Sequence, residues 1–372
     1  MSILYLQQSL NFYGEQESRT FVGEQLIHYT QQPLMILFTT LSFSCVAKKY
    51  IIVVFFILFF KMSNKLIHQI QYAIQISREI IMSLVREKIK KNQFVVTSEL
   101  TPPKGTDLTE MLDKAALLGE YVDAINVTDS HGSKMSLSSL AAARKLVDQG
   151  IEPIMQLTAR DRNRIALQGD MLGAWVLGVR NIIFMGGDPP QRGDHPEATP
   201  VFDIGTNEII AAAASLNDGC DMQSNPLHGS TDFHIGAVVN PGADDLETEI
   251  EKLEAKVASG ARFFQTQAVF DISSFKAFLN KIDHLSITLL AGIMPIKSVK
   301  MATYMNQNIP GIDVPENIIN RIDQASDVIE VNLEICSEII EDLKSICGGI
   351  HIMAPAWEKN IPTLIQRVGL KK

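Results

Sequence analysis

The chain is poor in cysteine and carries no surplus of basic residues. Its cysteines are far apart and lack C-x-x-C spacing, which argues against a disulfide scaffold and a structural zinc site; they are Cys45, Cys220, Cys336 and Cys347. The formal net charge is −9 at pH 7, whereas a nucleic-acid partner requires a concentrated basic surface. We therefore expect a cytoplasmic enzyme or binding protein with reduced thiols, no metal site and no nucleic-acid partner.

A long uninterrupted hydrophobic run is also missing. Residues 34–60 are strongly apolar and end in the apolar run 51–60, but Lys48 and Lys49 split the stretch. A helix the length of that run spans about 15 Å, and the hydrocarbon core of a membrane is about 30 Å thick. No small-residue cleavage site follows that would indicate a signal peptide.

Three interpretations remain for residues 1–61. Translation begins at Met62 or Met82 rather than at Met1, or the segment is a membrane tether, or it is a disordered appendage. The abrupt change at Met62 from a sequence rich in Phe, Ile and Tyr to an ordinary amphipathic sequence favours the first interpretation.

The rest of the chain divides into a lead-in and a repeated pattern. Residues 62–91 predict an amphipathic helical lead-in with a basic end, packed against the bottom of the first strand of the following domain. That domain, residues 92–372, contains eight short apolar runs that alternate with helical stretches. Most runs are continuous, as expected of strands buried on both faces. The runs span 93–98, 122–127, 151–157, 181–186, 233–239, 262–266, 286–293 and 349–353, and the helical stretches span 106–118, 136–149, 161–177, 207–217, 244–259, 271–281, 297–306 and a longer region at 315–345.

This alternation predicts an α/β fold, a (β/α)₈ TIM barrel with an N-terminal extension. An open doubly wound sheet is the alternative, but no G-x-G-x-x-G follows the first run.

Polar residues stand at the C-terminal ends of the runs, where barrels place their active sites. Glu99 ends the first run and precedes a Pro-Pro turn, a position suited to a catalytic acid. Asp188 follows two glycines, which let a ligand approach the backbone closely. Gln267 follows the sixth run, and its neutral amide suits an amide or heterocycle edge. His131 follows the second run without a second ligand at metal spacing, and Lys256 lies in the helix before the sixth run.

These residues fall in ordered motifs that resemble those of the methylenetetrahydrofolate reductases, which are flavin-dependent (β/α)₈ barrels. The resemblance covers about residues 92–372. The motifs are Ser98-Glu99-Leu-Thr-Pro-Pro103, Asn126-Val-Thr-Asp129, Gln156-Leu-Thr158, Gly186-Gly-Asp-Pro-Pro190, Gly236-Ala-Val-Val-Asn-Pro-Gly242 and Phe264-Gln-Thr-Gln267. Each motif is weak by itself, and the ordered set is specific.

The resemblance implies a reaction and a role for each residue. Reduced FAD would deliver hydride to 5,10-methylenetetrahydrofolate and give 5-methyltetrahydrofolate, in one-carbon metabolism and methionine biosynthesis. Glu99 would protonate N10 of the folate, Asp188 would tune the flavin and stabilise the cationic iminium, and Gln267 would hold the pterin. The implied flavin-binding positions are Thr128, His131, Gln156, Gly186, Gly187, Asp188 and Lys256.

Departures from the family pattern leave the electron donor open. Gln156 stands where a histidine is common, residues 299–305 stand where an aromatic residue is often found, and residues 354–357 lack an arginine. NAD(P)H, reduced ferredoxin and a partner subunit are the candidate donors. The resemblance also fits a homo-oligomer, and a flavin-binding electron-relay subunit that is active only with a partner protein. It does not distinguish a folate from a methanopterin-like carrier.

Overall fold

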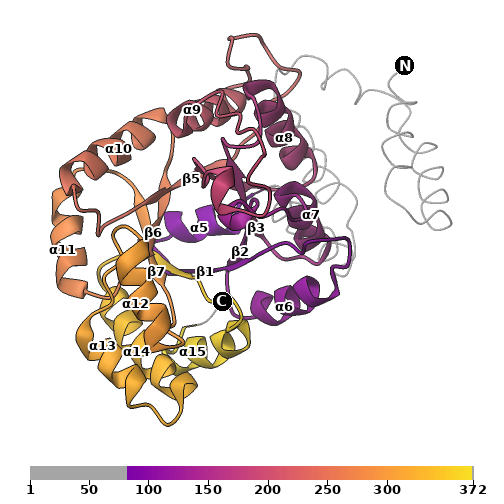
Figure 1. Ribbon diagram of the computed structural model, residues 1–372. Helices are drawn as coiled ribbons and strands as arrows, with labels where there is room; N and C mark the ends of the chain where they lie inside the picture. The colour runs from indigo at the N-terminus through magenta and orange to yellow at the C-terminus, as the bar shows by residue number, and fades with distance from the viewer. Residues whose placement is uncertain (1–81, 371–372) are drawn as a thin grey trace, which may run out of the picture. The chain divides into compact units, whose positions relative to one another are not determined.

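A computed structural model describes residues 82–370 of the chain (Figure 1). The predictions for residues 1–61, and for the lead-in before residue 82, lie outside the described residues. Within the described part, no helix is both long enough and apolar enough to cross a membrane.

Eight parallel strands close into a barrel, and each strand pairs with its neighbours in chain order. The strands are β1 (Val95–Leu100), β2 (Ala124–Val127), β3 (Pro153–Thr158), β4 (Asn181–Met185), β5 (His234–Val239), β6 (Phe263–Ala268), β7 (Thr288–Ile293) and β8 (Gly349–Ile352). Each strand overlaps the apolar run that predicted it. The structure therefore confirms the predicted (β/α)₈ fold.

Helices form the outer ring around this barrel (Figure 1). They are α6 (Thr109–Gly119), α7 (Ser139–Asp148), α8 (Arg164–Val176), α9 (Thr206–Asn217), α10 (Leu246–Ser259), α11 (Ile272–Lys281), α12 (Val299–Asn308), α13 (Glu316–Asp323), α14 (Val328–Leu343) and α15 (Ile361–Arg367). The helical region expected at 315–345 is two helices, because Asp327 starts a new one by accepting hydrogen bonds from the N–H groups of Ile329 and Glu330. Short 3₁₀ turns follow β2 (η2, His131–Ser133), β4 (η3, Pro190–Arg192) and β8 (η4, Glu358–Asn360).

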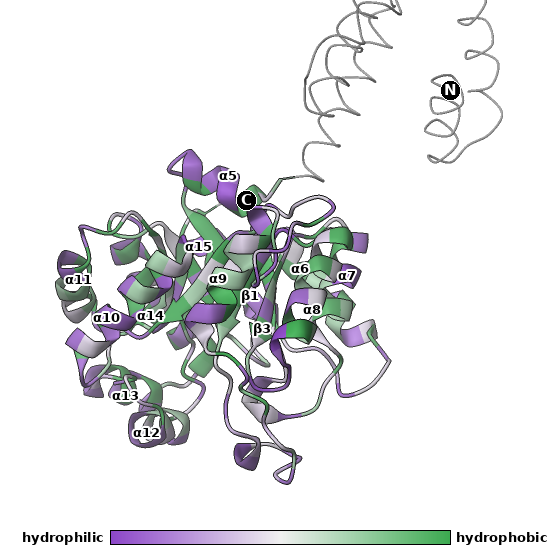
Figure 2. Cartoon of the chain, turned by 90° about the horizontal axis from the view of Figure 1, so that it is seen from above, coloured by the Kyte–Doolittle hydropathy of each residue, from purple (hydrophilic) through white to green (hydrophobic). Residues whose placement is uncertain are grey.

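Apolar residues concentrate on the strands and on the helix faces turned toward them, and polar residues cover the outside (Figure 2). Inside the barrel, one apolar layer fills the amino-terminal end. It consists of Val95, Ala124, Ile154, Ile183, Phe263 and Leu290, together with Val85 of helix α5 (Leu84–Lys90). The Phe263 ring fills the place of a β5 side chain, since a Cβ on Gly236 would lie 2.4 Å from that ring. Helix α5 therefore closes the amino-terminal end of the barrel.

One carboxylate holds the first turn of α5. Glu152, which precedes β3, accepts hydrogen bonds from the backbone N–H groups of Leu84 at 2.8 Å and Val85 at 3.2 Å. Ser83 donates to Oδ1 of Asn181 at 2.5 Å and so fixes the start of the helix to β4. Burial raises the pKa of Glu152, although these hydrogen bonds favour its ionised form.

Candidate active site

A polar layer lies above the apolar layer, toward the carboxyl ends of the strands. Asn126 and Gln265 exchange amide hydrogen bonds of 2.6 and 3.0 Å across the barrel interior. Gln265 also donates to Oγ1 of Thr97 at 3.4 Å, and Thr97 Oγ1 lies 3.0 Å from Nδ1 of His351. Four strands thus contribute one connected network beneath the mouth of the barrel.

Glu99 stands directly above this network. It is the penultimate residue of β1, and its side chain is 19% exposed. Its Oε2 atom lies 3.7 Å from Nε2 of the buried His351, which is an ion-pair separation and longer than a direct hydrogen bond. Burial alone raises the pKa of Glu99, but His351 and, more weakly, His131 outweigh it and hold the pKa below its ordinary value.

His351 is not among the site residues expected from the sequence. The available signal was a histidine inside the short buried run Gly349–Ile352, where every other side chain is apolar or absent. A titratable side chain on an inward-facing strand position requires a partner inside the barrel. The sequence could not show that the partner is Glu99, because β1 and β8 become neighbours only when the barrel closes.

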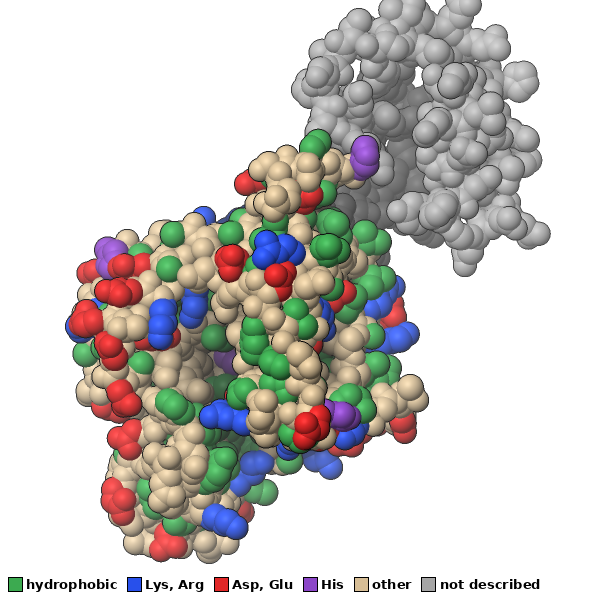
Figure 3. Space-filling model, turned by 45° about the horizontal axis from the view of Figure 1, so that its top comes forward, with side chains coloured by type: hydrophobic (Ala, Val, Ile, Leu, Met, Phe, Trp, Pro, Cys, Tyr) green, Lys and Arg blue, Asp and Glu red, His purple; other side chains and the backbone are tan. Residues whose placement is uncertain are grey.

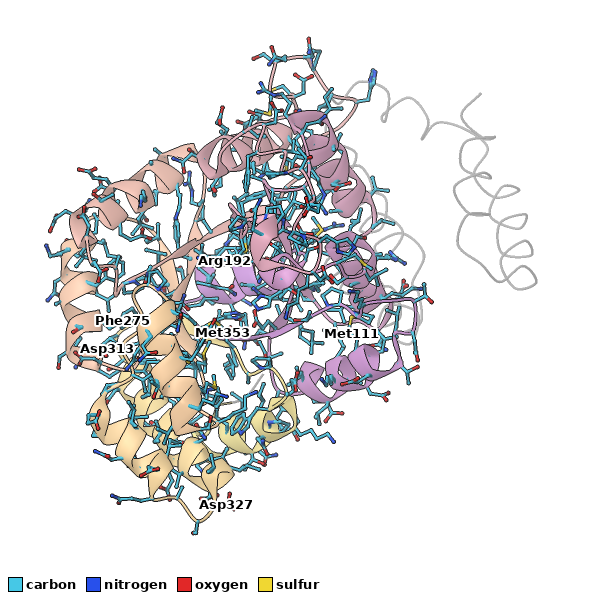
Figure 4. All side chains as sticks on the ribbon, in the orientation of Figure 1. Met111, Arg192, Phe275, Asp313, Asp327 and Met353 are labelled. Atoms are coloured by element: carbon cyan, nitrogen blue, oxygen red, sulfur yellow. The ribbon has the colours of Figure 1, made fainter. Side chains whose placement is uncertain are left out.

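Asp188 lies beyond the end of β4, where the backbone turns sharply. Gly187 has a φ of +91°, and a Cβ there would lie 3.2 Å from the Cβ atoms of Thr158 and Arg160. The Asp188 side chain is 46% exposed, and its Oδ1 accepts a hydrogen bond of 3.3 Å from the exposed guanidinium of Arg192. Arg192 lies over the middle of the ring of helices, as does Met353, whereas Phe275 and Asp327 lie in the outer layer (Figure 4).

Three of the implied flavin-binding residues follow β2 or lie in β3. Thr128 is 1% exposed, and within residues 82–370 its buried hydroxyl has no hydrogen-bond partner. Gln156 is buried and His131 is exposed in η2. Buried polar groups are almost always paired, and within the described residues the Thr128 hydroxyl is an exception.

The remaining implied flavin-binding residues follow β4 or lie in α10. Gly186 is exposed, and the nearest atom to a Cβ built on it is the Thr206 hydroxyl at 4.0 Å, so a flat ligand has room to approach this backbone. Lys256, in the last turn of α10, extends its ammonium to the carbonyl of Val238 at 2.7 Å, near the carboxyl end of β5. Burial lowers the pKa of Lys256. The hydroxyl, the amide and the ammonium are donors of the kind that a flavin and its phosphates require.

Gln267 lies at an irregularity between β6 and β7. The pairing register shifts between Gln265 and Ala268, and such bulges re-aim side chains next to active sites. The Thr266 hydroxyl donates to the Gln267 carbonyl at 2.7 Å, and the side-chain Oε1 of Gln267 accepts only a 3.2 Å bond from the N–H of Ala268. The side-chain amide N–H₂ of Gln267 donates to no group in the described part of the chain, so it can donate to a ligand.

The face of the molecule turned to the viewer in Figure 3 has a hollow, and Lys and Arg side chains lie beside it. Met305 and Trp357, which lie in the two segments where the sequence departs from the family pattern, are buried in the main hydrophobic core. Between residues 82 and 370, no cluster of three His, Cys, Asp or Glu side chains is placed to hold a metal ion.

Comparisons with known proteins agree with this architecture. The family model described as methylenetetrahydrofolate reductase matches residues 84–369. Methylenetetrahydrofolate reductase 1 of Schizosaccharomyces pombe is 24% identical over 299 residues, which cover 75% of this chain and 47% of the relative. The 5,10-methylenetetrahydrofolate reductase of Pectobacterium carotovorum is 24% identical over 227 residues, which cover 58% of this chain and 70% of the relative.

A solved structure has the same fold. It is an uncharacterized protein from Clostridium thermocellum described as binding two copies of 5-methyl-5,6,7,8-tetrahydrofolic acid; the TM-score is 0.53 at 16% identity, over 77% of this chain and 98% of that one. The chain spans about half the length of the first two curated relatives, 47% and 45%. Since the family model covers most of the sequence, the chain belongs to the methylenetetrahydrofolate reductase family.

Proposed function

We propose that the chain reduces 5,10-methylenetetrahydrofolate to 5-methyltetrahydrofolate with a bound FAD. The observation that carries the proposal is the Glu99–His351 pair at the mouth of the barrel. Glu99 lies in β1, which pairs with β2, and the orphaned Thr128 hydroxyl follows β2. An acid that can be protonated and a set of polar donors for a flat heterocycle are the two things this reaction requires of the protein.

Glu99 is the proposed general acid. The flavin, when bound and reduced, supplies hydride to the methylene carbon; Glu99 supplies a proton to N10 as the five-membered ring opens. The His351 imidazole keeps the pKa of Glu99 low in the ligand-free site. A pterin that covers the carboxyl excludes water from it, and the added burial raises its pKa toward the protonated form that can donate.

Asp188 and Gln267 are proposed to act on the pterin. The Asp188 carboxylate pairs with its neighbour Arg192 at 3.3 Å and is proposed to face the positive charge that develops on the iminium. This ion pair is exposed, with side chains 69% and 46% accessible, so it is weak enough to exchange for a ligand. Gln267 offers a neutral amide to the pterin edge.

The remaining positions implied by the resemblance are proposed to hold the flavin. Thr128, Gln156 and Lys256 offer a hydroxyl, an amide and an ammonium, Gly186 and Gly187 leave room at the backbone, and His131 stands at the rim.

An anaerobic half-reaction tests the proposal. The purified chain is loaded with FAD, photoreduced and mixed with methylenetetrahydrofolate while the flavin absorbance is followed. We expect reoxidation of the flavin and formation of 5-methyltetrahydrofolate, detected by mass spectrometry. A reduced flavin that stays reduced in the presence of the folate contradicts the proposal. NADH, NADPH and reduced ferredoxin, each added separately to the oxidised protein, identify the donor.

A further inference from the structure

Arg160 carries a charge into the interior of the site. It follows β3, and its side chain is only 3% exposed. The guanidinium Nη1 donates to the Ser133 hydroxyl at 2.9 Å and to the backbone carbonyl of Asp188 at 3.3 Å, and Nη2 donates to the carbonyl of Ser130 at 3.4 Å. Arg160, in the loop after β3, therefore contacts both the loop after β2 (the β2 loop, with Ser130 and Ser133) and the loop after β4 (the β4 loop, with Asp188).

The orientation of this guanidinium is fixed by Asp161. The Asp161 carboxylate accepts from Nε at 2.8 Å and from Nη2 at 2.7 Å, a bidentate pairing that holds the planar group in one direction. The Ser133 hydroxyl adds a second tie, since it donates to the Asp188 carbonyl at 2.6 Å. The Asp188 carbonyl is thus held from two sides, while its carboxylate pairs with the exposed Arg192.

The segments that Arg160 joins have unfavourable backbone conformations. Ser130 and Ser133 both have positive φ angles, of 48° and 57°, and Gly187 precedes Asp188 with a φ of 91°. Non-glycine residues adopt this region only when surrounding contacts hold them there. Arg160 supplies such contacts to both serine positions at once.

We propose that Arg160 is a positioning residue that sets the place of Asp188 for the reaction proposed above. It acts through the backbone carbonyl of Asp188 and through the β2 loop, whereas Arg192 acts on the carboxylate itself. This inference depends on the proposed function for its catalytic consequence and on the contacts alone for the tie between the loops.

Hydrogen exchange of the chain without flavin tests whether Arg160 holds the β2 loop and the β4 loop together. The amides of Ser133, Arg192 and Gly193 are hydrogen-bonded within their own turns, so their exchange reports local opening. In Arg160→Met we expect exchange to rise about tenfold in both segments 130–134 and 187–193. Arg162→Met is the matched control, because Arg162 lies on the same loop and pairs with Asp129 and Asp170; it should leave segment 187–193 unchanged. A rise in only one segment, or in neither, overturns the proposal.

A double-mutant cycle tests whether Arg160 positions Asp188 for the reaction. Arg160→Met should slow folate-dependent flavin reoxidation about 100-fold, the cost of a small misplacement of a reacting group. In an Asp188→Asn background the same substitution should slow it less than about threefold, because the group that it positions is already disabled. Equal losses in both backgrounds overturn the proposal and indicate a purely structural role.

Two milder variants test the proposal with less risk of misfolding than Arg160→Met. Ser133→Ala removes one of the two ties to the Asp188 carbonyl without removing a charge, and Arg160→Lys keeps the charge but cannot reach several acceptors at once. Both should show smaller losses in the same direction. If the unmutated chain itself fails to oxidise its flavin with the folate, the proposed function fails, and the exchange experiment still decides whether Arg160 joins the loops.

Discussion

The His351 imidazole links Glu99 to the polar interior of the barrel. One ring nitrogen lies 3.7 Å from the Glu99 carboxylate and the other lies 3.0 Å from the Thr97 hydroxyl. If Nε2 carries the proton that faces Glu99, the neutral ring must accept from Thr97 at Nδ1. In that tautomer the Thr97 hydroxyl donates to Nδ1, and the Nε2–H of His351 faces the ionised Glu99.

Replacing His351 should change the pH dependence of the reaction. In His351→Gln the burial of Glu99 is no longer opposed by the imidazole, so the pKa of Glu99 should rise. A larger fraction of the acid is then protonated at any given pH, and the loss of the folate half-reaction on the alkaline side should move to higher pH. The measurement is the rate of flavin reoxidation between about pH 5 and pH 9. Thr97→Val should shift the profile in the same direction by less, and an unchanged profile in His351→Gln would contradict the assignment.

Removing the acid should separate binding from chemistry. Glu99→Gln keeps the size of the side chain and lies in β1, whereas the orphaned Thr128 hydroxyl follows β2, so the variant should bind FAD as before. Its folate half-reaction should fall about 1,000-fold, within the range that general acid catalysis contributes. Glu120→Gln, an exposed position at the end of α6, is the matched control and should react normally. Turnover within a few-fold of normal in Glu99→Gln would remove Glu99 from this role.

Thr128→Val should have opposite effects on the empty and the loaded protein. The substitution removes a buried hydroxyl that has no partner in the described structure, so the free energy of unfolding without flavin should stay equal or rise by about 1 kcal/mol. The dissociation constant for FAD should increase about tenfold because a ligand hydrogen bond is lost. Urea denaturation and flavin titration measure the two effects.

Thr158→Val is the contrasting control. Its hydroxyl donates to the buried Asp129 at 2.9 Å, so this change should lower the free energy of unfolding by about 1 to 2 kcal/mol. If Thr128→Val destabilises the empty protein as much as Thr158→Val does, its hydroxyl has a partner within the chain, and the inference of a ligand there is wrong.

The sequence was sufficient for the barrel and for the position of Glu99. Continuous apolar runs separated by amphipathic helices specify strands buried on both faces, and the residues at the run ends then share one rim. The role of His351 was not predicted because it depends on a partner in β1, and β1 and β8 become neighbours only when the barrel closes. The bulge that aims Gln267 was missed for a related reason, since it is a mismatch in pairing between β6 and β7 and has no signature in either strand.

The split of the last helical region and the contacts of Arg160 could not be predicted from the sequence either, because each depends on the contacts of one side chain. Periodicity continues across residues 324–327, and only the capping contacts of Asp327 reveal a new helix start. Arg160 stood in a polar string after the third run, where most arginines are solvated. Its burial follows from the loops of β2 and β4 folding over it, which no local pattern encodes.

The contact of α5 with Glu152 should make stability depend on pH in an unusual direction. Because burial raises the pKa of Glu152 in the folded state, its contribution to stability is complete below the ordinary glutamate pKa and is lost as the pH rises through the raised value. The free energy of unfolding of the unmutated chain should therefore fall relative to that of Glu152→Gln as the pH rises above the ordinary glutamate pKa. Urea denaturation at several pH values measures this difference.

Glu87, on α5 itself, provides a control of the opposite sign. Its hydrogen bond with Lys90 lowers the pKa of Glu87, so its contribution is present above the ordinary glutamate pKa and is lost as the pH falls. The side chain is 30% exposed and its partner 57%, so solvent screens the pair and the effect should be small. As the pH rises, the free energy of unfolding of the unmutated chain should increase slightly relative to that of Glu87→Gln. It should decrease relative to that of Glu152→Gln. Parallel pH slopes for the two comparisons would show that Glu152 is not the carboxyl on which the docking of α5 depends.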